Sequence, residues 1–99
     1  MINHVVLFKF KAFPADEKQA KLSQLKNALL GLKDKIAELQ HLEVGTNHEL
    51  DAKSYDLCLI SHFNSLADLK VYAVHPEHLK VLELVKAYTE LRAAVDYEF

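Results

Sequence analysis

The sequence is poor in the residues that mark linkers and disulfides. Only two glycines and two prolines occur among 99 residues, so we expect no low-complexity segment and a single domain over residues 1–99. Cys58 is the single cysteine, which excludes an internal disulfide. A lone thiol suits a reducing compartment, and the cytoplasm is therefore the expected location.

Charge and hydropathy argue against two kinds of partner. The 12 basic and 14 acidic residues leave a net charge of −2 without a basic cluster. Nucleic-acid binding is not expected, because neutralising phosphates requires clustered Lys and Arg. No apolar run approaches the ~20 residues that cross a bilayer, so no membrane partner is expected. The stretch "MINHVVLFKFK" has no early positive charge and no small-residue cleavage site, so a signal peptide is not expected.

Alternation of apolar and polar residues predicts strands over residues 2–11 and 55–63. The short runs "HLEVG" and "AAVDYEF" are expected to form two more strands, and "TNHELDAKS" is the turn-rich loop. In the first strand, His4 shares a face with the apolar residues Ile2, Val6, Phe8 and Phe10. In the later strand, Tyr55, Leu57, Leu59, Ser61 and Phe63 share one face, and Asp56 falls on the other.

Helical spacing predicts two helical regions between these strands. The first opens at Pro14 and carries a stripe of apolar residues, Leu22, Leu25, Leu29, Leu32 and Ile36. Gly31 is expected to weaken or end this helix. The second region starts with Asn64 or Ser65 as the cap and breaks at Pro76, which suits the first position of a new helix. Its expected inward residues before the break are Leu66, Leu69 and Tyr72, and the helix after the break runs through Leu79, Leu82 and Val85.

The element order is β-α-β-β-α-β, which predicts an α+β, ferredoxin-like fold with helices on one face of a four-stranded antiparallel sheet. The other face should be polar if it meets water. Its central positions instead hold apolar or weakly polar residues, Val5, Leu7, Cys58 and Ile60. A contiguous apolar patch of this kind requires a partner, and a second copy packed sheet on sheet is the simplest one. We therefore expect a homodimer.

Three polar side chains are expected to meet on the helix-facing side of the sheet. His78 shares its helical face with Val81, Leu82 and Val85, Tyr72 continues the stripe of Leu66 and Leu69, and His4 lies beside Val6 and Phe8. An apolar crevice with a few convergent polar groups is typical of a small-molecule pocket. A histidine is suited to accept a proton near neutral pH, and a tyrosine hydroxyl is suited to donate to a developing oxyanion. The same residues also fit a purely structural role, because buried polar groups hydrogen-bond each other or the backbone.

Several stretches resemble the stress-responsive α/β-barrel (Dabb) family. They are "HVVLFKF", "LEVGTN", "YDLCLISHFNSLADLKVYAVHPEHLKV" and "VDYEF", and together the likeness covers essentially the whole chain. The resemblance implies dimers of ferredoxin-like subunits whose sheets close into a barrel. Most members have no assigned chemistry, but one plant branch consists of cofactor-free polyketide (olivetolic acid) cyclases. Tyr72 and His78 match the Tyr and His of that branch in position, and Leu57 stands where the branch carries another His.

His75 and His78 are three residues apart, a spacing at which histidines can bind zinc or copper. We expect no metal there, because His75 precedes Pro76 and lies outside the helix. His75 is instead expected to satisfy free N–H groups at the helix start, with a place in the pocket as the alternative.

Three functions remain open. The first is a cofactor-free enzyme acting on a carbonyl or polyketide-like compound through His78 and Tyr72. The second is a non-catalytic dimeric domain that binds a small apolar ligand. The third is a monooxygenase, and it rests on analogy between dimeric barrels alone.

Overall fold

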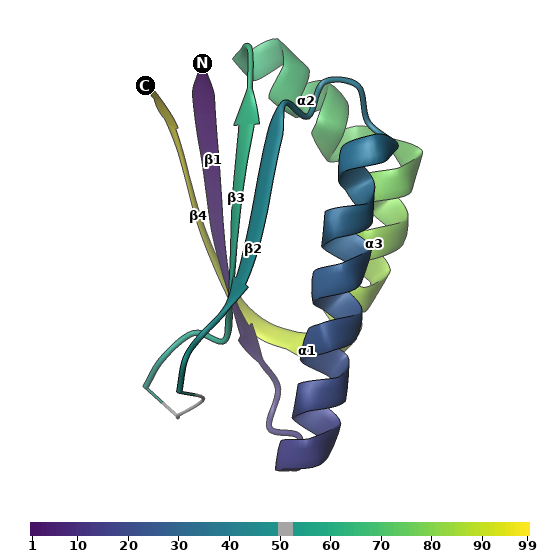
Figure 1. The fold of residues 1–99 in the computed structure, drawn as a ribbon, viewed down its shortest axis with the longest axis vertical. Helices are drawn as coiled ribbons and strands as arrows, with labels where there is room; N and C mark the ends of the chain where they lie inside the picture. The colour runs from purple at the N-terminus through teal and green to yellow at the C-terminus, as the bar shows by residue number, and fades with distance from the viewer. Residues whose placement is uncertain (50–52) are drawn as a thin grey trace.

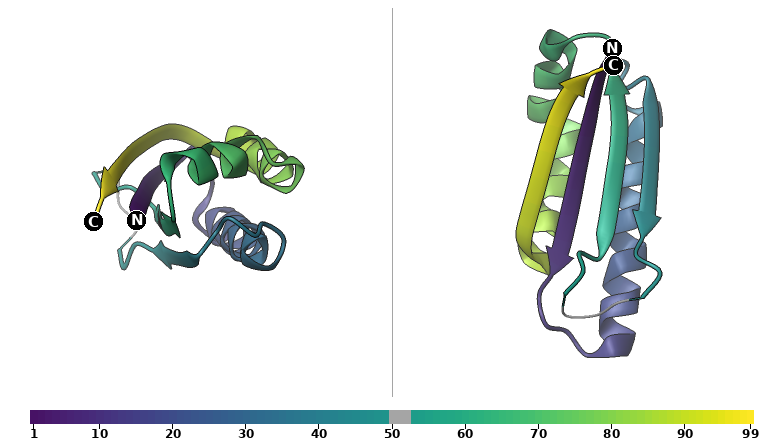
Figure 2. Two further views of the ribbon diagram at one scale, coloured as in Figure 1. Left: turned by 90° about the horizontal axis from the view of Figure 1, so that it is seen from above. Right: turned by 90° about the vertical axis from the view of Figure 1, so that its left-hand side faces the viewer.

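The computed structural model describes residues 1–49 and 53–99. The elements follow the order β1 (Ile2–Phe10), α1 (Ala15–Leu30), the 3-10 helix η1 (Gly31–Asp34), β2 (His41–Thr46), β3 (Leu57–Phe63), α2 (Leu66–Val74), α3 (Pro76–Tyr88) and β4 (Thr89–Glu98). The strands form one antiparallel sheet in the order β2-β3-β1-β4. The helices lie on one side of this sheet and leave the other side open (Figures 1 and 2). The α+β, ferredoxin-like fold is therefore confirmed.

The first helix ends as its sequence indicates. Asp16 and Glu17 lie in its first turn, where acidic side chains suit the helix dipole. Three leucines of the predicted stripe, Leu22, Leu25 and Leu29, are buried. At Gly31 the α-helix gives way to η1, which buries Leu32, and Ile36 is buried just beyond it. The expected break at Gly31 is confirmed.

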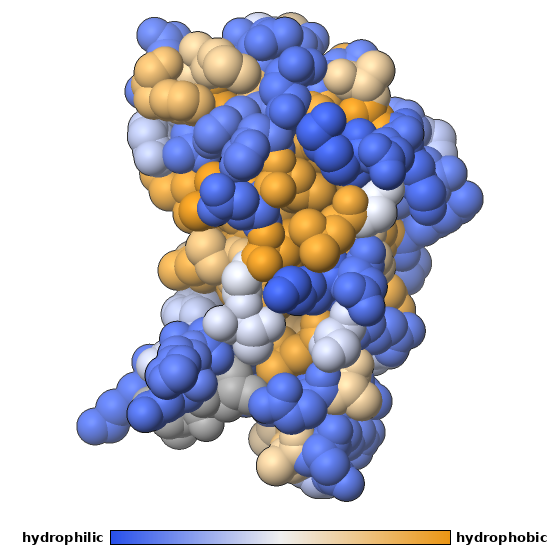
Figure 3. All heavy atoms as spheres, in the orientation of Figure 1, coloured by the Kyte–Doolittle hydropathy of each residue, from blue (hydrophilic) through white to orange (hydrophobic). Residues whose placement is uncertain are grey.

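Strands β1 and β3 each bury one face of alternating side chains in the core. In β1 the even-numbered side chains from Ile2 to Phe10 are buried, and in β3 the odd-numbered ones from Leu57 to Phe63. The edge strand β2 is less covered, and its Leu42 and Val44 are only partly buried against the core. Figure 3 shows apolar surface in the band between the edge of the sheet and helix α1. The core thus lies between the helical layer and the two central strands.

The second helical region breaks where expected, but Leu66 is more exposed than its spacing predicts. His75 has an extended backbone and separates α2 from α3, and Ser65 caps α2 by accepting the N–H of Asp68 at 3.1 Å. Leu66 is expected to point inward with Leu69 and Tyr72, yet it is 55% exposed. A spacing of three falls short of the 3.6-residue turn, so two such steps rotate a side chain about 120° around the helix.

The start of β3 corrects the predicted position of Asp56. The alternation predicts a strand from Tyr55 with Asp56 on the face away from Leu57, but the strand begins at Leu57, and Asp56 is fully buried. Asp56 Oδ2 accepts the backbone N–H of Phe10 at 2.7 Å, and Lys18 Nζ lies 3.0 Å from Oδ1. This carboxylate therefore connects the end of β1, the start of β3 and the first turns of α1.

Asp56→Ala is expected to lower the free energy of unfolding by about 1–3 kcal/mol, because it leaves the buried N–H of Phe10 without an acceptor. For a domain of this size each 1 kcal/mol corresponds to about 4–8 °C in melting temperature. Thermal melts followed by circular dichroism measure the change. Glu83→Ala removes an exposed carboxylate 3.9 Å from Lys86 and should melt within a few degrees of wild type. Equal melting of the two variants would contradict this role for Asp56.

The predicted loop over residues 46–54 is described only in part, since residues 50–52 lie outside the described part of the chain. The last strand begins at Thr89, four residues before the predicted "AAVDYEF". Within residues 1–49 and 53–99, no helix combines the length and apolar character needed to cross a membrane.

Candidate functional site

A cavity of about 270 Å³ lies between α2, the start of α3 and strand β4. Its wall includes Leu66, Leu69 and Tyr72 from α2, His78 from α3, His4 from β1, and Arg92 and Asp96 from β4. A narrow inner extension shares His4, His78 and Arg92 with it and continues between apolar side chains of the core. The volume is near the lower end of the ~300–1,000 Å³ typical of ligand pockets, so the cavity suits a small ligand.

His78 is held in one tautomer by the helix before it. Its Nδ1 lies 3.0 Å from the carbonyl oxygen of Ala73, and its ring centroid lies 4.4 Å from that of Tyr72. Because a carbonyl oxygen only accepts, Nδ1 carries the hydrogen, and Nε2 of the neutral ring keeps a free lone pair. Burial lowers the pKa of His78, and the nearby Arg92 charge lowers it further, although the bond to Ala73 acts in the opposite direction. The imidazole is therefore neutral at pH 7 and able to accept a proton at Nε2.

Tyr72 presents a buried hydroxyl without a partner. The residue is only 1% exposed, and its hydroxyl oxygen makes no hydrogen bond within the described ranges 1–49 and 53–99. Burial raises the pKa of Tyr72 to about 12, so the group remains a phenol. An unsatisfied buried donor costs about 1–3 kcal/mol and calls for a specific explanation. A ligand atom that accepts this hydrogen bond is one such explanation.

His4 forms the back of the cavity and is fixed from β4. Asp96 is its register partner across the β1–β4 pair, and His4 Nδ1 donates to Asp96 Oδ1. The His4 ring is buried and lies edge-on to Tyr72, with 6.3 Å between the ring centroids. The structure thus brings together His4, Tyr72 and His78, the three polar residues that the sequence placed on the helix-facing side of the sheet.

His75 does not line this cavity. It caps α3, and its Nδ1 accepts the N–H of Glu77 at 3.1 Å, which is the helix-start role expected from its place before Pro76. Its second proposed role, as a pocket residue, is therefore not supported by its position. The described residues contain no group of three or more His, Cys, Asp or Glu side chains placed to hold a metal ion.

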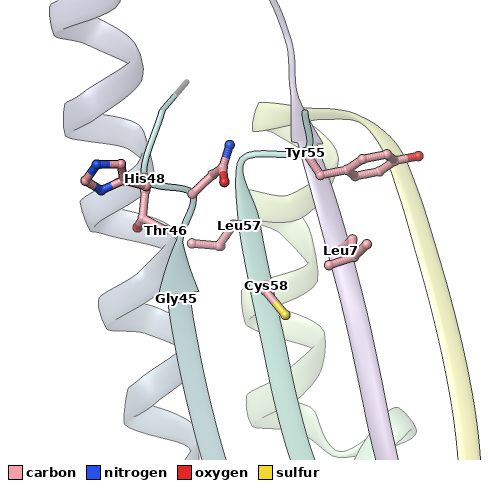
Figure 4. Close-up of a pocket in the computed structure, with 8 residues that line it drawn as sticks. Leu7, Gly45, Thr46, His48, Tyr55, Leu57 and Cys58 are labelled. Atoms are coloured by element: carbon pink, nitrogen blue, oxygen red, sulfur yellow. The ribbon is translucent and has the colours of Figure 1, made fainter. Parts of the chain in front are cut away.

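Leu57 also lies away from the three polar residues. It lines a different hollow of about 310 Å³, together with Leu7, Gly45, Thr46, Asn47, His48, Tyr55 and Cys58 (Figure 4). Figure 4 shows the rings of His48 and Tyr55 pointing in opposite directions, so polar groups do not converge there. Leu57 is separated from His4 because the end of β3 that carries it lies opposite Phe8, four residues along β1. This hollow is the larger one, but the smaller cavity holds the convergent polar groups.

Two residues of the cavity, Arg92 and Asp96, were missed by the sequence analysis. Both lie on β4, opposite Phe8 and His4 respectively, and so on the helix-facing side of the sheet. The signal available was that Arg92 is the sole arginine of the chain and stands between Leu91 and Ala93. Its relation to His78 depends on the register between β1 and β4, which local patterns do not specify.

The antiparallel sheet, its one-sided helical layer and the cavity between them define a ferredoxin-like domain with a small internal site. The model of the family described as Stress responsive A/B Barrel Domain (Dabb) matches residues 2–99. The chain belongs to this family.

Three relatives set the range of similarity. The stress-response A/B barrel domain-containing protein DABB1 of Arabidopsis thaliana is 31% identical over 98% of the chain, which spans only 46% of that relative. A dimeric ferredoxin-like protein of unknown function from Bacteroides fragilis is 37% identical, with a TM-score of 0.90 over 99% of this chain and 95% of its own. A hydroxynitrile lyase from Passiflora edulis, 19% identical, has a TM-score of 0.81 over 97% of this chain and 90% of its own. The last likeness is one of fold alone.

Proposed function

We propose that this domain binds a small carbonyl compound in the cavity beside Tyr72 and transfers a proton from it to His78. The observation that carries the proposal is the buried hydroxyl of Tyr72, which has no hydrogen-bond partner among the described residues. It lies next to an imidazole whose Nδ1 is hydrogen-bonded to Ala73, so that Nε2 carries the lone pair. An enzyme that forms an enolate needs this combination of a base and a hydrogen-bond donor. No cofactor is required for the step.

The step uses both groups at once. His78 Nε2 takes a proton from the carbon next to the carbonyl group, and the electron pair of the broken C–H bond moves onto the carbonyl oxygen. Tyr72 donates a hydrogen bond to that oxygen as it becomes negative. Return of the proton from His78 gives exchange, whereas attack of the enolate carbon on a second carbonyl gives ring closure of an aldol type. The low exposure of Tyr72 keeps water away from the developing charge.

The apolar lining supports a second candidate, which is binding without chemistry. Leu66 and Leu69 line one wall of the cavity, and the inner extension is mostly apolar. A small apolar ligand would bury this surface without use of the lone pair on His78. The monooxygenase alternative gains no support from the side chains of the described cavity.

We also propose that the domain acts as a homodimer. The open face of the sheet carries Val5, Leu7, Cys58 and Ile60 and continues onto β4, where Leu91, Val95 and Tyr97 are 55%, 54% and 48% exposed. An exposed apolar sheet face of this extent is typical of an interface. The similar protein from Bacteroides fragilis is described as dimeric, which supports the same assembly here. A cytoplasmic location belongs to this proposal, because the free thiol of Cys58 stays reduced there.

Proton exchange tests the chemistry without knowledge of the natural substrate. The methyl protons of acetophenone exchange slowly in neutral D₂O, and their loss is followed by proton NMR with and without the protein. We expect the wild-type protein to accelerate the exchange at substoichiometric concentration. Binding of acetophenone without acceleration would favour the second candidate. If the protein neither binds nor accelerates exchange of any ketone in an apolar panel, both candidate functions are wrong.

The rate of this exchange is expected to depend on pH through His78. An ordinary histidine has a pKa of about 6.5, and burial lowers that of His78, so its basic form predominates at pH 7. After subtraction of the buffer reaction, the rate should be constant from pH 7 to 8 and fall as the pH drops below about 6.5. A rate that still rises between pH 7 and 8 would show that a base with a higher pKa is responsible.

A further inference from the structure

We infer that Arg92 makes the cavity selective for ligands that carry a carboxylate as well as the carbonyl group. The inference rests on the proposed function, because it concerns the same cavity. It adds the chemical class of the ligand, which neither the family nor the catalytic pair specifies.

Arg92 is an exposed residue of the edge strand β4 whose side chain lines the site. It lies on β4 opposite Phe8 and lines both the main cavity and the inner extension. Its charge acts on both Tyr72 and His78, which places the guanidinium close to the two groups of the proposed reaction. A ligand seated against those two residues is therefore within reach of the guanidinium.

The positive charge of Arg92 is not neutralised within the described chain. Arg92 makes no hydrogen bond or ion pair with residues 1–49 or 53–99. Asp96 is the one carboxylate among the described lining residues, and it already accepts a hydrogen bond from His4. Lys70 lines the same cavity and adds a second positive charge. The described lining of the cavity thus carries two cations and one carboxylate, and that carboxylate accepts a hydrogen bond from His4.

A guanidinium in this position suits a carboxylate. Its planar fork donates two parallel hydrogen bonds to the two oxygens of a carboxylate, and it is less strongly hydrated than an ammonium group. The walls formed by Leu66 and Leu69 suit an apolar body between the carboxylate and the carbonyl group. The small volume restricts that body to a single ring or a short chain. The fitting class is therefore a compact keto acid.

Two probes of equal shape and different charge test the inference. 4-Acetylbenzoate carries the carboxylate, and 4-acetylbenzamide replaces it by a neutral amide while keeping the same ketone. Titrations followed by protein NMR give the dissociation constant of each probe for wild type, Arg92→Gln and Arg92→Lys. We expect wild type to bind the benzoate about 10- to 100-fold more tightly than the benzamide, the range for hydrogen bonds between charged groups.

The variants separate Arg92 from a general effect of charge. Arg92→Gln should lose most of the preference and keep only the part that Lys70 supplies, and Arg92→Lys should keep more of it, although an ammonium cannot form the paired hydrogen bonds. Lys86→Gln removes one positive charge from an exposed position of α3 and should keep the full preference. Loss of the preference in Lys70→Gln but not in Arg92→Gln would overturn the assignment to Arg92.

The outcomes for ligand class and for chemistry are distinguishable. Exchange of both ketones without a preference for the benzoate would overturn the inference and leave the proposed function in place. Arg92-dependent binding of the benzoate without exchange would support the inference and remove the proton-transfer function. Failure of the benzoate to bind would overturn the inference, whereas the proposed function would still be decided by the exchange of neutral ketones.

Discussion

His78→Ala is expected to lower the protein-dependent rate of ketone exchange by about 10²–10⁴-fold, the usual contribution of a general base. The variant loses the Nε2 lone pair that accepts the proton, while the apolar wall of the cavity remains. The hydrogen bond from Nδ1 to Ala73 and the ring contact with Tyr72 are lost, and Ala73 itself is exposed on α2. We therefore expect a folded protein with little or no exchange activity.

Tyr72→Phe is expected to separate activity from stability. The rate should fall by about 10²–10³-fold if the hydroxyl stabilises an oxyanion. The melting temperature should stay the same or rise, because the variant removes a buried donor that has no partner among the described residues. A gain in stability with a loss of activity is the behaviour expected of a group kept for function. A tyrosine with only a structural role would show the reverse.

A control variant and thermal melts separate a catalytic role of His78 and Tyr72 from a structural one. His75→Ala is the matched control. His75 lies three residues before His78, caps α3 and does not line the cavity. This change should cost about 1 kcal/mol of stability as a lost helix cap, and it should leave the exchange rate nearly unchanged. If His78→Ala and Tyr72→Phe both melt well below wild type and both keep wild-type exchange, the two residues are structural and the proton-transfer function is wrong.

Local patterns were sufficient for the elements and for part of the site. The alternation in β1 placed His4 on the helix-facing side, and the His75–Pro76 step marked the boundary between α2 and α3. These features depend on neighbours in the sequence, because side-chain direction alternates along a strand and proline restricts the residue before it. Because the helices pack on the face of the sheet that carries His4, the inward residues Tyr72 and His78 lie close to it.

The remainder of the site depends on contacts distant in the sequence. Arg92 and Asp96 reach the cavity through the register of β4 against β1, which pairs residues more than 80 positions apart. Asp56 is buried because the end of β1 and the start of α1 meet over it, although the alternation of its neighbours predicts the face away from Leu57. The state of the Tyr72 hydroxyl depends on every group around it. Tertiary contacts of this kind determine which polar groups have hydrogen-bond partners. Local patterns in a single sequence do not reveal these contacts.

Leu7→Asp and Ile60→Asp are expected to convert a dimer into monomers. Both side chains lie on the open face of the sheet, where β1 and β3 pair at its centre. A carboxylate at the centre of an apolar interface loses its hydration without gaining a partner, at a cost of several kcal/mol. The dissociation constant should therefore rise on the order of 10³-fold. Because each helix-facing core residue is unchanged, the monomer should keep its secondary structure.

Sedimentation equilibrium from nanomolar to high micromolar concentration measures this constant for wild type and for each variant. Leu79→Asp is the matched control, because Leu79 is 47% exposed on α3, away from the open face of the sheet, and the change there introduces the same charge. It should remain dimeric, whereas Leu7→Asp and Ile60→Asp should sediment as monomers at concentrations where wild type is fully paired. A wild-type protein that is monomeric at micromolar concentration would refute the dimer, and the apolar face of Val5, Leu7, Cys58 and Ile60 would then require a different partner.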